Sequence, residues 1–364
     1  MARIEKQAWK PRGGICLSSR AIAAWSLCLA LFVGLTSPAF AVGIASDHTS
    51  DYLLVGLGNQ NDIGTAVAVS NFELGANSVS VPMSGLAGSV PSLPGNAQTV
   101  FVGVGGNGDV AVTHSNGNFD MSNVDIFGDT GIDCTGGLGN CDTGNSNSEF
   151  NGSALNNANG LNGNVDLSGV TGELAAAQSE IPSFVGDHAL SLSFGDGKWG
   201  DGDNVVINLA LGITVIDIDT HENDLTLTNS NLLFDGPEGA FAIVRISDEA
   251  NFLVSQSNIV VGDGGIGLNN VLFYTDKGDN NQHININNAI INGIAFWDLG
   301  NSGGEITFNN VQGCTQAIAD KINLNDVRLN NCGAAIPEPG TGLLVAVGLG
   351  VLGTAGRTGM RRAS

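Results

Sequence analysis

Basic residues are scarce in this sequence. It has 13 Lys and Arg against 35 Asp and Glu over 364 residues, a formal net charge of −22. Eight of the basic residues lie near the two ends, so residues 42–336 hold five basic residues against 33 acidic ones. Nucleic-acid binding needs clustered cations that displace counterions from phosphates. We therefore expect no nucleic-acid partner, and we read the acidic surface as a device for solubility.

The sequence also lacks two common metal-site and redox signatures. It contains no HExxH and no CxxC, and its five histidines are scattered (His48, His114, His188, His221 and His283). A β-helical polysaccharide-active enzyme remains an alternative, since 33 acids will always include some pair within the reach that glycoside cleavage requires. A lyase would instead need a cationic base, for which Arg245 and Lys277 are the candidates. The expectation is a protein without catalytic residues.

Cysteines are few. Of six, Cys16 and Cys28 lie in the leader described below, and the other four are Cys134, Cys141, Cys314 and Cys332. Four cysteines in an exported chain allow three pairings, which sequence alone does not separate. Closeness in sequence favours two local disulfides, one joining the first two of these cysteines and one joining the last two.

The first 41 residues have the three-part order of a secretory signal peptide. A cationic stretch ends at Arg20, an apolar run covers residues 21–35, and a small-x-small triplet spans Ala39 to Ala41. The prediction is Sec-dependent export with cleavage after Ala41. The alternative is an uncleaved anchor helix, which the short apolar run disfavours.

The last residues, 334–364, form a second processing segment. Pro337, Glu338 and Pro339 precede an apolar span at 341–356 and a basic tail at 357–364 that contains Arg357, Arg361 and Arg362. A span of 16 residues rises about 24 Å as a helix, less than the roughly 30 Å hydrocarbon core. It would make a marginal transmembrane anchor, with the arginines held on the cytoplasmic side.

This order of motif, span and basic cluster resembles the PEP-CTERM sorting signal of Gram-negative bacteria. The resemblance implies recognition of Pro337, Glu338 and Pro339 by an exosortase, a membrane transpeptidase, in a host that makes exopolysaccharide or biofilm. The chain would be anchored transiently in the inner membrane and then sorted to the cell surface or released. The alternative is a plain tail anchor.

Residues 42–333 carry a recurring six-residue pattern of apolar, any, apolar, small polar, polar or Gly, and small or apolar. Its starts from Leu225 onward are 27, 32, 22 and 16 residues apart, which suits the coils of a solenoid. The occurrences are VAVSNF (67–72), FDMSNV (119–124), VDLSGV (165–170), LTLTNS (225–230), FLVSQS (252–257), ININNA (284–289), ITFNNV (306–311) and INLNDV (322–327).

The pattern predicts a mainly β fold, a right-handed parallel β-solenoid, with an antiparallel β-sandwich as the alternative. Asparagine tolerates the left-handed conformation and can bond to a stacked amide, so corners are predicted at Asn229, Asn288, Asn310 and Asn331. The aromatic side chains of Phe252, Phe273, Phe296 and Phe308 are predicted to pack in the core.

One segment predicts a helix instead. Residues 173–180 (ELAAAQSE) are good helix formers, Thr171 can cap them and Pro182 stops them. Leu174 and Ala177 would share one face and dock against the strands.

The layout of a β region, this helix and the stretch 205–330 resembles the choice-of-anchor A family of bacterial surface proteins. The resemblance implies an ice-binding-like β-solenoid with a flanking helix and a surface or matrix role, and it supplies no catalytic residues.

Two acidic clusters suggest calcium. Asp196, Asp201 and Asp203 lie on a glycine-rich loop, and Asp217 and Asp219 lie beside His221. Calcium takes six to eight oxygens from such loops, but neither cluster fits a known calcium motif, and solvated turns are the alternative.

The sequence therefore predicts an exported structural or adhesive module linked to exopolysaccharide or biofilm. The alternative is a carbohydrate- or ice-binding module. The mixture of Asn, Ser and Thr at the repeated positions counts against ice, which calls for a regular array of Thr.

Overall fold

A computed structural model describes residues 48–58, 65–74, 91–97, 110–112, 118–126, 132–135, 149–150, 153–154, 161–246, 250–275, 283–297 and 304–330. These residues all lie in one compact unit, residues 41–337. No helix in this described part is long and apolar enough to span a bilayer. The predicted signal peptide, the Pro-Glu-Pro motif, the apolar span and the arginine tail lie outside it.

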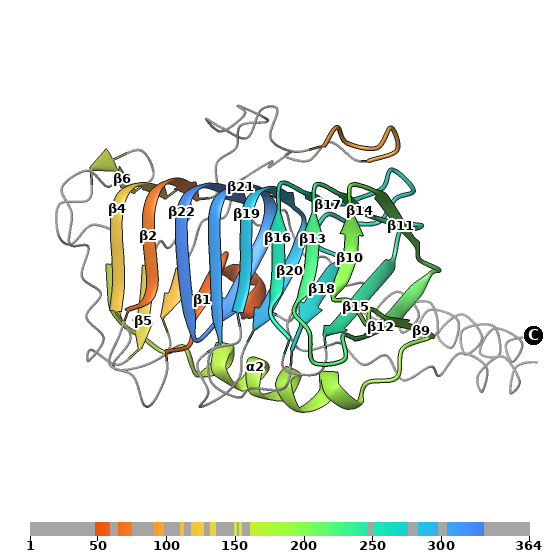
Figure 1. Ribbon diagram of the computed structural model, residues 1–364. Coiled ribbons are helices and arrows are strands. Elements are labelled where there is room, and N and C mark those ends of the chain that lie inside the picture. Colours follow the sequence, from red (N-terminus) through yellow and green to blue (C-terminus); the bar gives the residue numbers. More distant parts are fainter. Residues whose placement is uncertain are drawn as a thin grey trace, which may run out of the picture. The chain divides into compact units, whose positions relative to one another are not determined.

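The unit is a parallel β-solenoid with three strand faces (Figure 1). Face A contains β9 (His188–Ser193), β12 (Gly212–Asp219), β15 (Ala240–Ile246), β18 (Val271–Tyr274), β20 (Gly293–Trp297), the end of β21 (Glu305–Ala319), β1 (Leu54–Gly56), β3 (Val110–Val112), β5 (Ile132–Thr135) and β8 (Leu161–Val165).

Face B contains β10 (Lys198–Asp201), β13 (Leu225–Thr228), β16 (Phe252–Ser255) and the first halves of β19 (His283–Ile291), β21, β22 (Lys321–Asn330), β2 (Thr65–Leu74) and β4 (Asn118–Ile126). Face C contains β11 (Asn204–Asn208), β14 (Asn231–Asp235), β17 (Asn258–Val261) and the second halves of the same long strands. β6 (Glu149–Phe150) extends face C, and β7 (Ser153–Ala154) pairs with it antiparallel.

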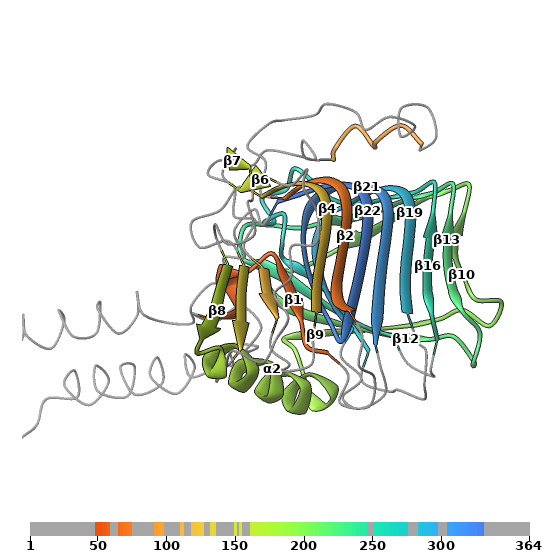
Figure 2. The ribbon, with the colours of Figure 1, turned by 90° about the vertical axis from the view of Figure 1, so that its left-hand side faces the viewer.

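The coils do not stack in chain order. Strands β9 to β22 wind from one end towards the middle, and there β22 pairs with β2 while the end of β21 pairs with β1. Strands β1 to β8 then continue the stack to the other end (Figure 2). The chain therefore begins in the middle of the solenoid, and α2 (Ser168–Glu180) precedes the strand at the opposite end, β9. This permuted order could not be read from the repeat spacing.

The repeated pattern explains why these residues form coils. Its first and third positions point inward and are fully buried wherever their side chains are described, for example Leu225 and Leu227. Seven of the eight predicted segments lie in one register, with Leu225, Phe252, Ile284, Ile306, Ile322, Val67 and Phe119 stacked in turn. The parallel prediction is confirmed, and the sandwich alternative is wrong for the described sheets.

The fifth position of the pattern turns the corner between faces B and C. Asn229, Gln256, Asn288, Asn310 and Asp326 all have φ between 49° and 54°, in the left-handed region. Asparagine adopts this conformation at a low steric cost. The side-chain amide of Asn310 also donates to the side-chain oxygen (Oδ1) of Asn288 at 2.7 Å, as predicted for stacked corners. Asn331 lies outside the described residues.

The segment VDLSGV is the exception, and its assignment to a coil is wrong. It ends β8 and begins α2, because Ser168 is already helical. The helix therefore starts three residues before Thr171, whose hydroxyl donates to the Ser168 carbonyl within the first turn. Asp166 takes the capping role instead: hydrogen bonds from the Ser168 side chain and then its backbone N–H lower the pKa of this carboxyl. The predicted end is confirmed, since α2 stops at Glu180 and the 3-10 helix η3 (Ile181–Ser183) follows.

Helix α2 covers the outer side of face A. Leu174 and Ala177 are buried against a cluster that includes Phe241 and Phe296 of face A, as predicted. The cluster also includes Val55 of β1 and Ala111 of β3, so one helix packs on strands from both parts of the permuted stack (Figure 1). The predicted core positions of Phe252, Phe273, Phe296 and Phe308 are confirmed, since all four are fully buried.

The short 3-10 helix η2 (Thr49–Asp51) is fastened beside α2. Glu173 of α2 accepts hydrogen bonds from the backbone N–H groups of His48 and Thr49, at 3.1 and 2.8 Å. The buried side chain of Gln316 donates to the carbonyl oxygens of Thr49 and Tyr52, both at 2.7 Å. The beginning of the described chain is thereby fixed to both the helix and face A.

Candidate functional site

Face B carries two outward columns of side chains, which we call the open face. Across the described residues no helix or strand packs on its outer side (Figure 1). The first column is Lys198, Thr226, Leu253, Asn285, Thr307, Asn323 and Ala68, and the second is Asp201, Thr228, Ser255, Asn287, Asn309, Asn325 and Ser70. These are the second and fourth positions of the repeated pattern, with β10 added at one end.

Hydrogen bonds hold the open-face side chains in place. The side-chain amide of Asn325 donates to Oδ1 of Asn309 at 2.9 Å, and its own Oδ1 accepts a hydrogen bond from the Ser70 hydroxyl at 2.9 Å. Within one coil, the Asn287 amide donates to Asn285 at 2.6 Å. Because each amide is oriented by a neighbour, a ligand would meet a partly ordered surface and would lose less side-chain entropy on binding.

Glu305 makes a second network at the edge of the open face. It accepts hydrogen bonds from the Thr307 hydroxyl at 3.0 Å, from the Lys321 ammonium at 3.3 Å and from the Asn323 amide. His283 lies next to Glu305 in the strand register. Sequence reasoning did not single out Glu305 or Lys321, although both directly precede a copy of the repeated pattern.

The spacing of the open face is regular. Neighbouring coils of a parallel sheet lie about 4.7 to 4.9 Å apart, and alternate residues along a strand lie roughly 6 to 7 Å apart. Each asparagine side chain offers both a donor and an acceptor. The open face is therefore a grid of small groups that can exchange hydrogen bonds with an extended, polar surface.

The other two faces are covered, wholly or in part. Face A lies beneath α2, as described above. On face C, Leu93 and Ala97 pack over the apolar side chains of Leu233, Val260 and Ile290. The amides of Asn231 and Asn258 donate to the carbonyl oxygens of Ser92 and Pro91, at 3.0 and 2.8 Å. Face B thus offers the longest exposed array among the described residues.

The five predicted calcium ligands do not converge. Asp196 accepts from the Lys198 backbone N–H at 3.2 Å, Asp201 binds the Lys198 ammonium at 3.1 Å, and Asp203 is exposed. Asp219 accepts from the backbone and ring nitrogens of His221, both at 2.9 Å. Among the described residues, no three His, Cys, Asp or Glu side chains are grouped to hold a metal ion.

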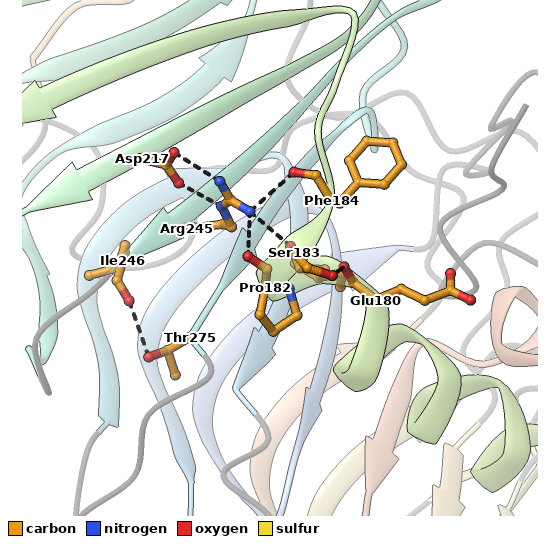
Figure 3. Close-up of polar contacts among 9 residues, drawn as sticks. Glu180, Pro182, Ser183, Phe184, Asp217, Arg245, Ile246 and Thr275 are labelled. Carbon is orange, nitrogen blue, oxygen red and sulfur yellow. Dashed lines mark hydrogen bonds and ion pairs between the residues drawn. The ribbon is translucent and has the colours of Figure 1, made fainter. Parts of the chain in front are cut away.

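Asp217, the fifth predicted ligand, is engaged by Arg245. The guanidinium donates twice to this carboxylate, at 2.6 and 2.8 Å, and also donates to the carbonyl oxygens of Ile181, Pro182 and Phe184 at 2.8 to 3.2 Å (Figure 3). Arg245 therefore ties the segment after α2 to face A, and its guanidinium N–H groups are engaged in these structural hydrogen bonds. This geometry does not support its predicted alternative role as a catalytic base. Lys277 and His114 lie outside the described residues.

Only two of the four cysteines predicted to form disulfides lie in the described residues. Cys314 is fully buried and disulfide-bonded, and its neighbour in the register is Asn330. Cys141 and Cys332 lie outside the described residues, and only the backbone of Cys134, in β5, is within them. Both pairings remain predictions.

Several solved structures with a similar fold are titled ice-binding proteins. One from an Antarctic Biological Consortium is 12% identical with a TM-score of 0.42, and the match covers 81% of this chain and 92% of that one. A glycosylated protein from Arctic yeast is 11% identical with a TM-score of 0.37, covering 83% and 98%. One from an Antarctic Flavobacteriaceae bacterium is 14% identical with a TM-score of 0.39, covering 82% and 49%.

No family model matches the chain, and no curated protein matches it. At these identities and TM-scores, the likeness to the solved structures establishes neither a family nor a ligand.

Proposed function

We propose that this chain is an exported, non-catalytic surface or matrix protein whose open face binds an extended polysaccharide. The observation that supports this proposal is the two-column grid of small polar side chains on face B. Sugar hydroxyls both donate and accept hydrogen bonds, as amide and hydroxyl side chains do. A long polymer can lie across several coils at once, so many weak contacts add up.

The binding proposal predicts a loss of affinity when the column amides are removed. Replacing Asn309 and Asn325 together by alanine removes two exposed amides and leaves the buried positions intact. Each lost hydrogen bond costs about 1 kcal/mol, so we expect binding to the exopolysaccharide of the host to weaken roughly tenfold or more. The measurement is a binding isotherm on the immobilised polymer, repeated with and without Ca²⁺.

The matched control is Gln178→Ala, which removes an amide from α2 on the other side of the solenoid. It should bind as the unchanged protein does. Equal affinity of the double variant and this control would refute the open face as the binding site.

Ice is the second candidate ligand, because Thr226 and Thr228 stand side by side in a grid of constant coil spacing. The other positions of the two columns are five Asn, two Ser and one each of Thr, Leu, Ala, Lys and Asp, so the grid does not repeat a single group. An assay of ice recrystallisation separates the two candidates. Inhibition that is lost in the Asn309 and Asn325 double variant would favour ice.

The sorting proposal rests on the terminal segments. The apolar span is short and contains Gly342, Gly348, Gly350, Gly353 and Gly356, which suits a brief hold at the membrane. We expect that replacing Pro337, Glu338 and Pro339 by alanine leaves export intact but stops removal of the tail, so that the full-length chain accumulates in the inner membrane. Immunoblots of cell fractions provide the measurement. Normal processing of this variant in a host with an active exosortase would identify the tail as a plain anchor.

A further inference from the structure

The coil formed by β9, β10 and β11 ends the described part of the solenoid, and no described strand pairs with its outer side. Among the described strands, each pairs only with the next coil, through β12, β13 and β14. Two large hydrophobic side chains on its strands are exposed, Leu190 of β9 (37%) and Val206 of β11 (47%), and so are Val185 (86%) and Leu211 (67%) in the segments that flank the coil. The end coil therefore leaves apolar surface in contact with water.

Part of this surface is the core itself. Leu190 and Leu192 stack in register on Ile216 and Ile218, which point into the solenoid. Phe194 and Val205 also pack on the core and are only partly buried. Solenoids need a polar cap or a partner at such an end, because otherwise the last layer of the core stays hydrated. Bare backbone groups of an edge strand likewise favour pairing with another strand.

The charges on β10 indicate which partner fits. A bulge between Lys198 and Gly200 places both Lys198 and Asp201 on the open face, where their side chains meet at 3.1 Å. The strand reads Lys-Trp-Gly-Asp, with opposite charges at its two ends. If this strand pairs antiparallel with its own copy about its centre, Lys198 lies opposite the partner subunit's Asp201, and the reverse contact forms as well.

We propose that this end coil binds a second copy of the chain, end coil to end coil, about a two-fold axis through the centre of β10. Such an interface is isologous, so each contact occurs twice. It would cover the exposed core of both copies, bringing β9 of one copy next to β11 of the other. The self-complementary charges of β10 set the register, and a foreign strand without them would meet a bulged, charged edge.

The two-fold axis would also stand perpendicular to face B. The open faces of the two copies would then point the same way and join into one array of twice the length. This consequence rests on the proposed function, since a polymer bound along the joined array would gain avidity. The dimer itself does not depend on what the open face binds.

The test is the mass of the full-length chain in a mild detergent, measured by sedimentation over a series of concentrations. We expect two chains per particle. Lys198→Asp places two like-charge contacts at the two-fold axis and should raise the dimer dissociation constant roughly tenfold or more, as should Asp201→Lys. An equimolar mixture of the two variants should dimerise again, because every contact across the axis becomes attractive.

The mixture of the two variants distinguishes ion pairs between the two copies from the Lys198–Asp201 ion pair within one copy. Both single variants lose the internal pair, and mixing cannot restore it. Lys321→Asp is the matched control, since Lys321 forms an exposed pair with Glu305 away from the end coil, and its dimer should be unchanged. A single-chain mass at every concentration, or a mixture that stays dissociated, would overturn the proposal. If the unchanged protein forms the dimer but does not bind polysaccharide, that result counts against the proposed function only.

Discussion

Replacing Gly313 by alanine is expected to lower the free energy of unfolding by about 4 kcal/mol or more. Gly313 lies in β21 with φ at 148°, a conformation that other residues adopt at a cost. A methyl group there would overlap the backbone carbonyl oxygen of Ile291 in the neighbouring coil. Because that oxygen belongs to a paired strand, it cannot move without disturbing the sheet between β19 and β21.

Gly172→Ala is the matched control for this variant. Gly172 lies in α2, and a methyl group there would have no neighbour within 4 Å. Alanine has the better helix propensity, so this variant should be more stable by roughly 0.5 to 1 kcal/mol. Urea unfolding followed by circular dichroism measures both changes. A Gly313→Ala variant as stable as the unchanged protein would contradict the close approach of these two coils.

The second large effect is expected at the helix. Leu174→Ala should destabilise the protein by roughly 3 kcal/mol, because it leaves a cavity between α2 and face A. The helix packs on strands of both parts of the stack, so its loosening should weaken the junction where β1 meets β21. Hydrogen exchange should therefore accelerate in β1 as well as in α2.

Ser179→Ala is the control on the exposed side of α2. It should change the unfolding free energy by no more than about 0.5 kcal/mol. If Leu174→Ala has an equally small effect, or if only the helix exchanges faster, then α2 does not hold the two parts of the stack together.

Much of the coil could be predicted from the sequence because its causes are local. Alternation of apolar and polar residues decides which side chains point inward, and this alternation holds in segments as different as LTLTNS and ININNA. Asparagine at the fifth position predicts a corner because few residues adopt the left-handed conformation cheaply. Gln256 and Asp326 turn the same corner, and the residue type alone did not reveal them.

The start of α2 was predicted incorrectly for a reason that is also physical. Thr171 is a good capping residue, but the helix begins three residues before it, at Ser168. There the carboxylate of Asp166 accepts a hydrogen bond from the Ser168 backbone N–H. The docking of Val170 and Leu167 on face A then stabilises the additional turn. Tertiary burial decided between two acceptable caps, and a single sequence does not show which of them is buried.

The candidate site, too, could be predicted only in part from the sequence. Most side chains of the open face stand at positions two and four of the repeat, so their chemistry could be predicted from the repeat. Which array stays exposed depends on the folded chain, because α2 and residues 91–97 pack on the other two faces through contacts between segments far apart in the chain.

Local alternation and corner residues are enough to predict a mainly β chain that winds into parallel coils. The order of those coils was decided only in three dimensions. Every coil presents the same kind of edge, a row of backbone donors and acceptors above an apolar interior, so the repeat does not specify which coil lies next to which. The pairing of β22 with β2 and the packing of α2 across the junction choose one order, and they leave β9, β10 and β11 at the end of the stack.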